Sequence, residues 1–122
     1  MLKLAGVLDA LMPLPDQVTK AIAFMARHYR EPLLVGDVAR AAALSEDRLG
    51  HVFKKATGFP IKDYLTRLRI AIARRLLRET NVTLDIIAER VGLGDGSQFS
   101  RKFIDVAGIR PGEFRRSVRQ GI

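Results

Sequence analysis

The chain has 122 residues, with 21 Lys and Arg against 13 Asp and Glu, so its net charge is +8 at neutral pH. This length allows one domain or two very small ones, and 48% hydrophobic residues supply a modest core. The chain has no cysteine, which excludes disulfides, thiolate metal sites and a cysteine nucleophile, and its two histidines are too few for a histidine-rich metal site. The positive charge predicts a polyanionic partner, either nucleic acid or an anionic membrane surface.

The first segment, residues 1–15, is largely apolar. Its run Leu2–Leu14 carries Lys3 and Asp9 and is shorter than the about 20 apolar residues that a membrane-spanning helix needs. Asp9 also interrupts the run that a signal peptide requires, so we expect a cytoplasmic protein. The apolar residues follow helical spacing, which predicts a short surface or linker helix, with a dimerisation helix as the alternative.

Residues 16–59 are predicted to form a first subdomain of three helices. Pro32 ends the first helical run, because the residue before a proline is disfavoured in helical conformation. Ser45 is a suitable N-cap for the third helix, and Gly58 a suitable stop. The helices are expected at residues 16–29, 35–42 and 46–57.

A long linker helix is predicted within residues 60–80, over 61–79, and a second subdomain of three helices over 81–122. Thr83 and Asp95 are suitable N-caps in the second subdomain, and Pro111 suits the start of its last helix. Its helices are expected at residues 84–90, 96–106 and 112–118. The buried side of the linker helix is predicted to consist of Tyr64, Leu65, Leu68, Ile72, Leu76 and Leu77. The fold class is therefore all-α, with seven helices and no strand.

An internal repeat is the most informative feature of the sequence. Its spacing is 49 residues before a turn and 50 after it, and each copy contains a short helix, a tight turn, a capped helix and a glycine stop. The residues Ala39, Leu44, Leu49, Phe53, Gly58 and Tyr64 recur as Ala88, Leu93, Phe99, Phe103, Gly108 and Phe114. Two packed helices joined by a short turn form a helix-turn-helix, so the chain is predicted to contain two of them, joined by the linker helix.

The second helix of each copy, here called the reading helix, presents polar side chains away from its predicted core side. At 100° per residue, this outward face holds Asp47, Gly50, His51 and Lys54 in the first copy and Ser97, Arg101 and Ile104 in the second, with Gln98 on the flank. A helix of this kind fits the DNA major groove, where Arg suits guanine and Gln suits adenine. Arg101 and Gln98 are the strongest candidates for base contacts.

Basic and hydroxyl side chains near these helices are candidates for phosphate contacts. Arginine accounts for 15 of the 21 basic residues, and guanidinium groups bind phosphate in a bidentate manner. The arginines of the linker helix are expected to divide between DNA contacts, solvation and pairing with Asp63 or Glu79. The residues predicted to contact phosphates are Arg48, Lys54, Lys55, Thr83 and Lys102.

These residues carry a resemblance to the DNA-binding domain of the AraC/XylS family of bacterial transcription regulators. The matching segments are EPLLVGDVARAAALSEDRLGHVFKKATGFPIKDYLTRLRIAIARRLL and VTLDIIAERVGLGDGSQFSRKFIDVAGIRPGEFRR, within residues 18–116. The resemblance implies two helix-turn-helix subdomains on a shared linker helix, reading successive major-groove segments on one face of double-stranded DNA. It implies base contacts from Asp47, Gly50 and His51 in the first subdomain and from Gly96, Ser97, Gln98 and Arg101 in the second.

Several turn residues depart from the family pattern. Ala43 stands where the first turn usually has glycine, so this turn must reach a positive φ without the residue that adopts it most easily. Leu93 replaces an aromatic residue of the second turn, and Gly94 with Gly96 should leave that turn more flexible.

The reading helices also depart from the family pattern. Asp47 and Gly50 leave the first with few hydrogen-bond donors, and Ile104 occupies a position of the second that is often basic. We therefore expect weak base readout from the first subdomain and most of the sequence specificity from the second.

Other functions remain as alternatives. The sequence has no carboxylate pair beside a histidine at motif spacing and no phosphate-binding loop after a predicted strand, so we expect neither an enzyme nor a cofactor. A helical module that binds RNA polymerase or another protein is one alternative, and a basic amphipathic surface on a membrane is another. The resemblance implies that a small-molecule effector, if any, acts through a regulatory domain that this chain lacks, and the chain is either a fragment or a free-standing regulator.

Overall fold

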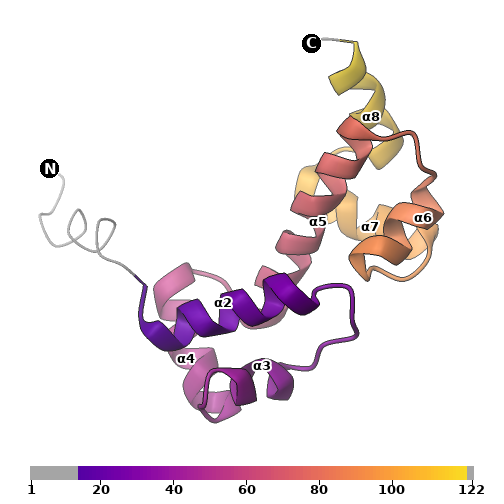
Figure 1. Cartoon of the computed structure of the whole chain (residues 1–122). Coiled ribbons are helices and arrows are strands. Elements are labelled where there is room, and N and C mark those ends of the chain that lie inside the picture. Colours follow the sequence, from indigo (N-terminus) through magenta and orange to yellow (C-terminus); the bar gives the residue numbers. More distant parts are fainter. Residues whose placement is uncertain (1–13, 121–122) are drawn as a thin grey trace, which may run out of the picture.

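The computed structural model describes residues 14–120, and within this range the chain forms seven helices and no strand, as predicted (Figure 1). The predicted helix within residues 1–15 lies almost wholly outside the described residues. The helices are α2 (Asp16–His28), α3 (Val35–Ala41), α4 (Glu46–Thr57), α5 (Ile61–Glu79), α6 (Leu84–Val91), α7 (Gly96–Ala107) and α8 (Pro111–Arg119). Two of the predicted helices, residues 46–57 and 61–79, match these bounds, and four others differ by one residue at the C-terminal end. The last helix begins at Pro111 rather than Gly112, because proline is favoured in the first turn.

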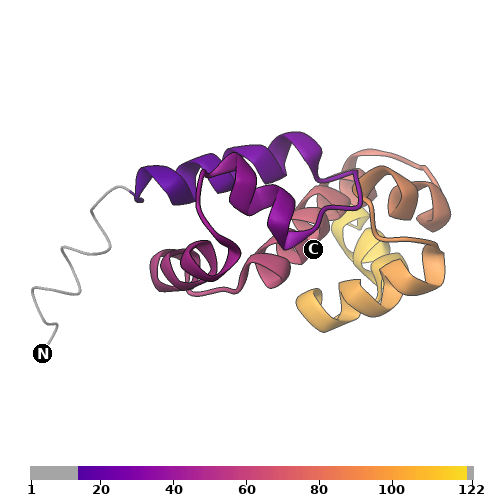
Figure 2. The same ribbon diagram turned by 90° about the horizontal axis from the view of Figure 1, so that it is seen from below.

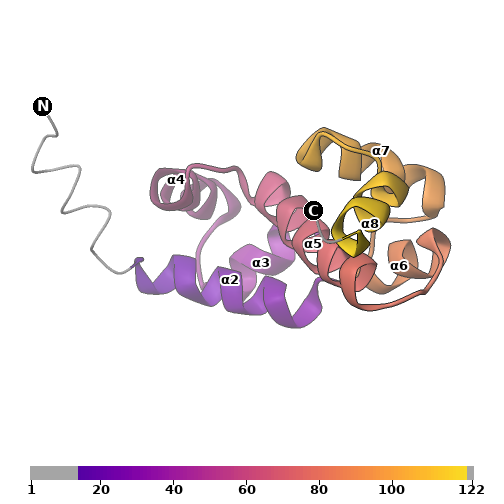
Figure 3. The same ribbon diagram turned by 90° about the horizontal axis from the view of Figure 1, so that it is seen from above.

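The helices enclose two separate hydrophobic cores on either side of α5. We call α2, α3 and α4 the first half and α6, α7 and α8 the second half (Figure 3). Each half packs within itself, and α5 packs against both. The first core contains Val18, Ala21, Met25, Val38, Ala39, Ala42, Leu49, Phe53, Ile61 and Leu65. The second core contains Ile70, Ala73, Leu77, Ile87, Ala88, Val91, Leu93, Phe99 and Phe103.

The linker helix α5 buries two faces rather than the single side predicted from the sequence. Ile61 and Leu65 belong to the first core, whereas Ile70, Ala73 and Leu77 belong to the second. At about 100° per residue these two groups are centred roughly 130° apart around the helix axis, so they form two distinct faces. The prediction was wrong in omitting Ile70 and Ala73, because a search for one apolar stripe cannot describe a helix that is covered from both sides.

The internal repeat is present in three dimensions. Phe53 meets Tyr64 edge to face with ring centroids 5.1 Å apart, and Phe103 meets Phe114 in the same way at 5.6 Å. Each member of the second pair lies 50 residues after its counterpart in the first. Both pairs join a reading helix to the helix that follows it, and such aromatic pairs add to the stabilisation from burial.

An arginine clamp is also repeated. Arg69 of α5 donates hydrogen bonds to the carbonyl oxygens of Tyr29 and Glu31, each at 2.8 Å, just after α2 ends. Arg119 of α8, 50 residues later, donates to the carbonyl oxygen of Thr80 and to Asn81, just after α5 ends. Burial lowers the pKa of Arg69, but a guanidinium keeps its proton in proteins. The Arg69 clamp therefore satisfies two backbone carbonyls just after a helix C-terminus, and the Arg119 clamp satisfies one backbone carbonyl and one side-chain oxygen.

Other arginines of α5 pair within the helix, as the sequence suggested. Arg67 lies 3.5 Å from Asp63 and its guanidinium stacks over the Phe59 ring at 4.5 Å. Arg75 pairs with Glu79 at 2.9 Å. These exposed pairs stabilise the helix only slightly.

Candidate nucleic-acid interface

The first helix-turn-helix consists of α3, a short turn and the reading helix α4. The turn reverses at Ala43, whose φ is +57°, and the Leu44 amide donates to the Ala39 carbonyl oxygen at 3.0 Å. The predicted cap is present, because the Ser45 hydroxyl accepts from the Arg48 amide at 3.2 Å. The turn therefore has the geometry that glycine adopts most easily, and alanine holds it at a conformational cost.

The second helix-turn-helix, α6 with the reading helix α7, has the same geometry with different residues. Gly92 occupies the position of Ala43 with a φ of +75°, and the Leu93 amide donates to the Ala88 carbonyl oxygen at 2.9 Å. The Asp95 carboxylate is the N-cap of α7 and accepts from the Gln98 amide at 2.9 Å. An N-cap of either type satisfies one of the amides that the first turn of a helix leaves unpaired.

A further carboxylate ties the start of α7 to α6, and the sequence analysis missed it. The Asp85 Oδ1 atom accepts from the Gly96 amide at 2.9 Å, and a Cβ at Gly96 would lie only 2.4 Å from that oxygen. Gly96 thus has no space for a side chain, and its amide already has a partner within the protein. The bond also restrains the turn that the two glycines were expected to make flexible. Asp85 carries no local signal for this bond, because its partner lies 11 residues away, beyond the range of a capping pattern.

The two reading helices lie on the same side of the molecule, and α2 lies on the opposite side (Figures 2 and 3). Their apolar sides are fixed by fully buried anchors, which are Leu49 and Phe53 in α4 and Phe99 and Phe103 in α7. A helix anchored in this way presents its other face to solvent. The arrangement leaves two polar helix faces pointing away from two separate cores in one general direction.

The residues predicted to contact bases divide between exposed side chains and glycines. The exposed ones are Asp47, His51, Ser97, Gln98 and Arg101. Gly50 and Gly96 are half-buried, and a Cβ at Gly50 would meet no atom within 4 Å. The Gln98 side-chain amide lies against Gly94, whose φ is +77°, and leaves no space there for a Cβ.

The residues predicted to contact phosphates also lie at the surface. All five, Arg48, Lys54, Lys55, Thr83 and Lys102, are exposed. The Thr83 hydroxyl accepts from the Ile86 amide at 3.3 Å as the N-cap of α6, and its hydrogen can still be donated to a phosphate oxygen. Ile104, which replaces a basic residue, is 39% exposed and contributes an apolar side chain to the same surface.

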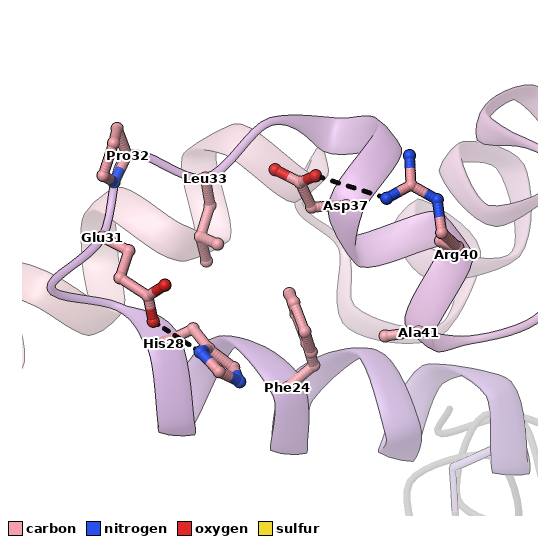
Figure 4. A pocket seen from close by; sticks show the side chains of 8 residues that line it. All are labelled: Phe24, His28, Glu31, Pro32, Leu33, Asp37, Arg40 and Ala41. Atoms are coloured by element: carbon pink, nitrogen blue, oxygen red, sulfur yellow. Dashed lines mark hydrogen bonds and ion pairs between the residues drawn. The ribbon is translucent and has the colours of Figure 1, made fainter.

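One surface hollow lies away from this interface, between α2 and α3 (Figure 4). Its polar residues pair with near neighbours in the sequence, His28 with Glu31 and Asp37 with Arg40. None of the residues predicted to contact DNA lines it. Within residues 14–120, no helix is long and apolar enough to cross a membrane.

The fold and this surface define a double helix-turn-helix domain, and comparisons with known proteins agree. Residues 38–117 match the family model described as a helix-turn-helix domain. The chain is 39% identical over 113 residues to a putative AraC-like transcription regulator of Streptomyces lividans, covering 93% of this chain and 35% of that protein. The chain thus spans about a third of the length of this relative.

Solved structures of known proteins share this fold. The C-terminal domain of AraT, a response regulator from Geobacillus stearothermophilus, superposes with a TM-score of 0.82 at 29% identity, covering 87% of this chain and 88% of that one. The DNA-binding domain of the transcription factor AdpA, solved in complex with a target DNA, has a TM-score of 0.81 at 24% identity and covers 87% and 96%. The chain belongs to the AraC/XylS type of helix-turn-helix DNA-binding domains found in transcription regulators.

Proposed function

We propose that the chain binds double-stranded DNA sequence-specifically, placing α4 and α7 in adjacent major-groove segments, and thereby regulates bacterial transcription. The observation that carries this proposal is that the two reading helices lie on one side of the molecule (Figure 3), each with exposed polar residues. A helix enters the major groove with its N-terminal residues near base edges, and both reading helices present exposed polar residues there.

The side chains divide into a positioning set and a specifying set. Arg48, Lys54, Lys55, Thr83 and Lys102 contact phosphates and set the register of the domain on the duplex. Ser97, Gln98 and Arg101 read bases in the second half, and Asp47 and His51 do so in the first. Phosphate contacts carry affinity with little sequence information, whereas base-edge contacts discriminate between sequences.

The two reading helices contribute unequally in this proposal. Arg101 can donate two parallel hydrogen bonds to the O6 and N7 atoms of guanine, the commonest specific base contact. At the equivalent position of α4, 50 residues earlier, stands His51, and Asp47 adds a negative charge near the phosphates. Base readout is therefore stronger from α7. RNA polymerase is proposed as a further partner of the chain, whereas any small-molecule effector would act through a separate regulatory domain.

The experiment is a titration of a fluorescent random duplex of about 30 base pairs across a range of salt concentrations, followed by anisotropy. Binding should weaken steeply as salt rises, because each neutralised phosphate releases counterions. The variant Lys54→Ala/Lys102→Ala should flatten this dependence. A matched control, Lys20→Ala/Arg27→Ala, removes the same charge from exposed positions on α2, on the opposite side. Equal effects of both pairs, or no binding at low salt, would refute the proposal, and binding to anionic lipid vesicles instead would favour a membrane surface.

A further inference from the structure

A close backbone contact joins the two halves at the second turn. A Cβ built on Gly92 would lie 2.8 Å from the carbonyl oxygen of Tyr29 and 3.0 Å from that of Arg30. Those carbonyls follow α2 in the first half, whereas Gly92 ends α6 in the second. Real Cβ atoms do not approach backbone oxygens so closely, so only glycine allows the halves to meet at this distance.

The partner segment at this contact is itself fixed. Arg69 of α5 holds the carbonyl oxygens of Tyr29 and Glu31 at 2.8 Å, on either side of Arg30. The segment that faces Gly92 is thus bonded to the linker helix, and it cannot yield to an added side chain as a flexible surface residue would. Among the described helices, the main packed pairs that connect the halves all involve α5. The Gly92 contact is therefore a second point of attachment, away from the axis of α5.

We propose that this contact sets the angle between the halves and so fixes where α7 lies relative to α4. A single connecting helix leaves the second half able to tilt or twist about it, and a second point of contact removes that freedom. Gly92 is a positioning residue in this proposal, because it touches neither base nor phosphate. On the proposed function, on which this part of the inference rests, the contact fixes the spacing between the two DNA segments that the chain reads.

The conformation of Gly92 does not by itself explain why glycine stands there. Ala43 holds a φ of +57° at the equivalent turn position of the first half, so this turn accepts a Cβ when nothing opposes it. Gly108 provides a matched control. It follows α7 with the same φ of +75°, and a Cβ there would meet no atom within 4 Å. Gly92→Ala and Gly108→Ala therefore share the backbone strain, and only the first adds the clash between halves.

The test measures the arrangement of the halves without DNA. Since the chain has no cysteine, spin labels can be attached to cysteines introduced at Ala23 in α2 and Asp105 in α7, both exposed and outside the predicted DNA contacts. Pulsed electron resonance should give one narrow distance distribution for the parent and for Gly108→Ala, and a shifted, broader one for Gly92→Ala. A second label pair at Glu89 in α6 and Asp105 in α7, both exposed and within the second half, should stay unchanged in all three proteins.

The inference is overturned if Gly92→Ala leaves the distance between halves unchanged, or if the pair within the second half shifts as much as the pair across the halves. Gly92→Asn supplies a second variant, because asparagine tolerates a left-handed backbone while keeping the clashing Cβ. It should reproduce the change, and an unaltered distance would again overturn the inference. Circular dichroism verifies that each variant is folded.

A DNA measurement then connects the contact to spacing. On a selected binding site, Gly92→Ala should weaken binding by about tenfold more than Gly108→Ala, because two linked reading helices gain affinity only when both engage together. Insertion of one base pair between the two DNA segments should lower the DNA affinity of Gly92→Ala by a smaller factor than it lowers the affinity of the parent protein. If the chain does not bind DNA at all, the proposed function fails, while the label distances still decide whether Gly92 fixes the halves.

Discussion

The two halves of the molecule share a scaffold and differ at the surface that it presents. Both have an edge-to-face aromatic pair, an arginine clamp and a turn residue with positive φ at equivalent places. Their reading helices differ, since α4 begins with Glu46 and Asp47 whereas α7 begins with Gly96 and Ser97. Buried and backbone features fix the fold and recur, while exposed positions vary and carry the chemistry of recognition.

One exchange between the halves shows how the scaffold is kept while the surface changes. In the second half the carboxylate of Asp85, on α6, bonds to the start of α7 at Gly96. In the first half the residues are reversed, because Gly36 stands on α3 and Glu46 begins α4, with its carboxylate 3.7 Å from where a Cβ of Gly36 would lie. Each half thus pairs one carboxylate with one glycine where the two helices approach. The carboxylate of this pair lies on the reading helix in the first half and on the preceding helix in the second half. The first turn of α4 accordingly carries two carboxylates, Glu46 and Asp47, whereas the first turn of α7 carries none.

The largest expected effect tests whether the two cores are equivalent. Phe53→Ala and Phe103→Ala each remove a fully buried ring at matched positions, and each should lower the free energy of unfolding by about 3–5 kcal/mol. Chemical denaturation followed by circular dichroism measures both values. A loss below about 1 kcal/mol for either variant would show that its core does not depend on the ring as its counterpart does.

The next prediction sets the two reading helices against each other on DNA. Arg101→Ala should remove about 1–3 kcal/mol of discrimination at one base pair, because it deletes a bidentate contact, and His51→Ala should remove less. A base-substitution scan of a bound site with both variants measures the loss at each position. If His51→Ala relaxes specificity more than Arg101→Ala, the proposed order of the two helices is wrong.

A smaller effect concerns the two turns. Ala43→Gly should raise the free energy of unfolding by about 0.5–1 kcal/mol, since glycine adopts the left-handed conformation without the strain of a Cβ. Ala41→Gly, two residues earlier at the exposed end of α3, is the control and should be destabilising because its backbone is helical. Thermal unfolding compares the two. A destabilised Ala43→Gly protein would contradict the assignment of strain to this turn.

The smallest expected effect exchanges one charge between the halves. Lys54 in α4 and Ile104 in α7 occupy equivalent positions 50 residues apart. DNA affinity falls as salt rises from 50 to 200 mM, and each phosphate contact contributes a factor of roughly three to this fall. Lys54→Ile should therefore make the fall roughly threefold smaller, and Ile104→Lys should make it roughly threefold larger. Anisotropy titrations at several salt concentrations measure this. No change with Ile104→Lys would mean that this part of α7 does not face the phosphates.

The sequence predicted most of the fold because its elements have local signals. Ser45, Thr83 and Asp95 are N-caps as expected, and Gly58 and Gly108 end their helices in left-handed conformation. The second buried face of α5 was missed, because Ile70 and Ala73 are buried by helices distant in the sequence. The Asp85 bond to Gly96 and the approach of Gly92 to Tyr29 were missed for the same reason. Helical spacing identified which residues face outward, but not how the two faces are held relative to each other.

The most direct test of the account is selection of binding sites from random double-stranded DNA by the chain itself, repeated with Arg101→Ala. The account predicts a site of two segments about 10 base pairs apart, the spacing of successive major grooves on one face of the helix. One segment should carry most of the sequence information and lose it when Arg101 is replaced. A single uninterrupted segment, or two segments of which the weaker one responds to Arg101→Ala, would contradict the account.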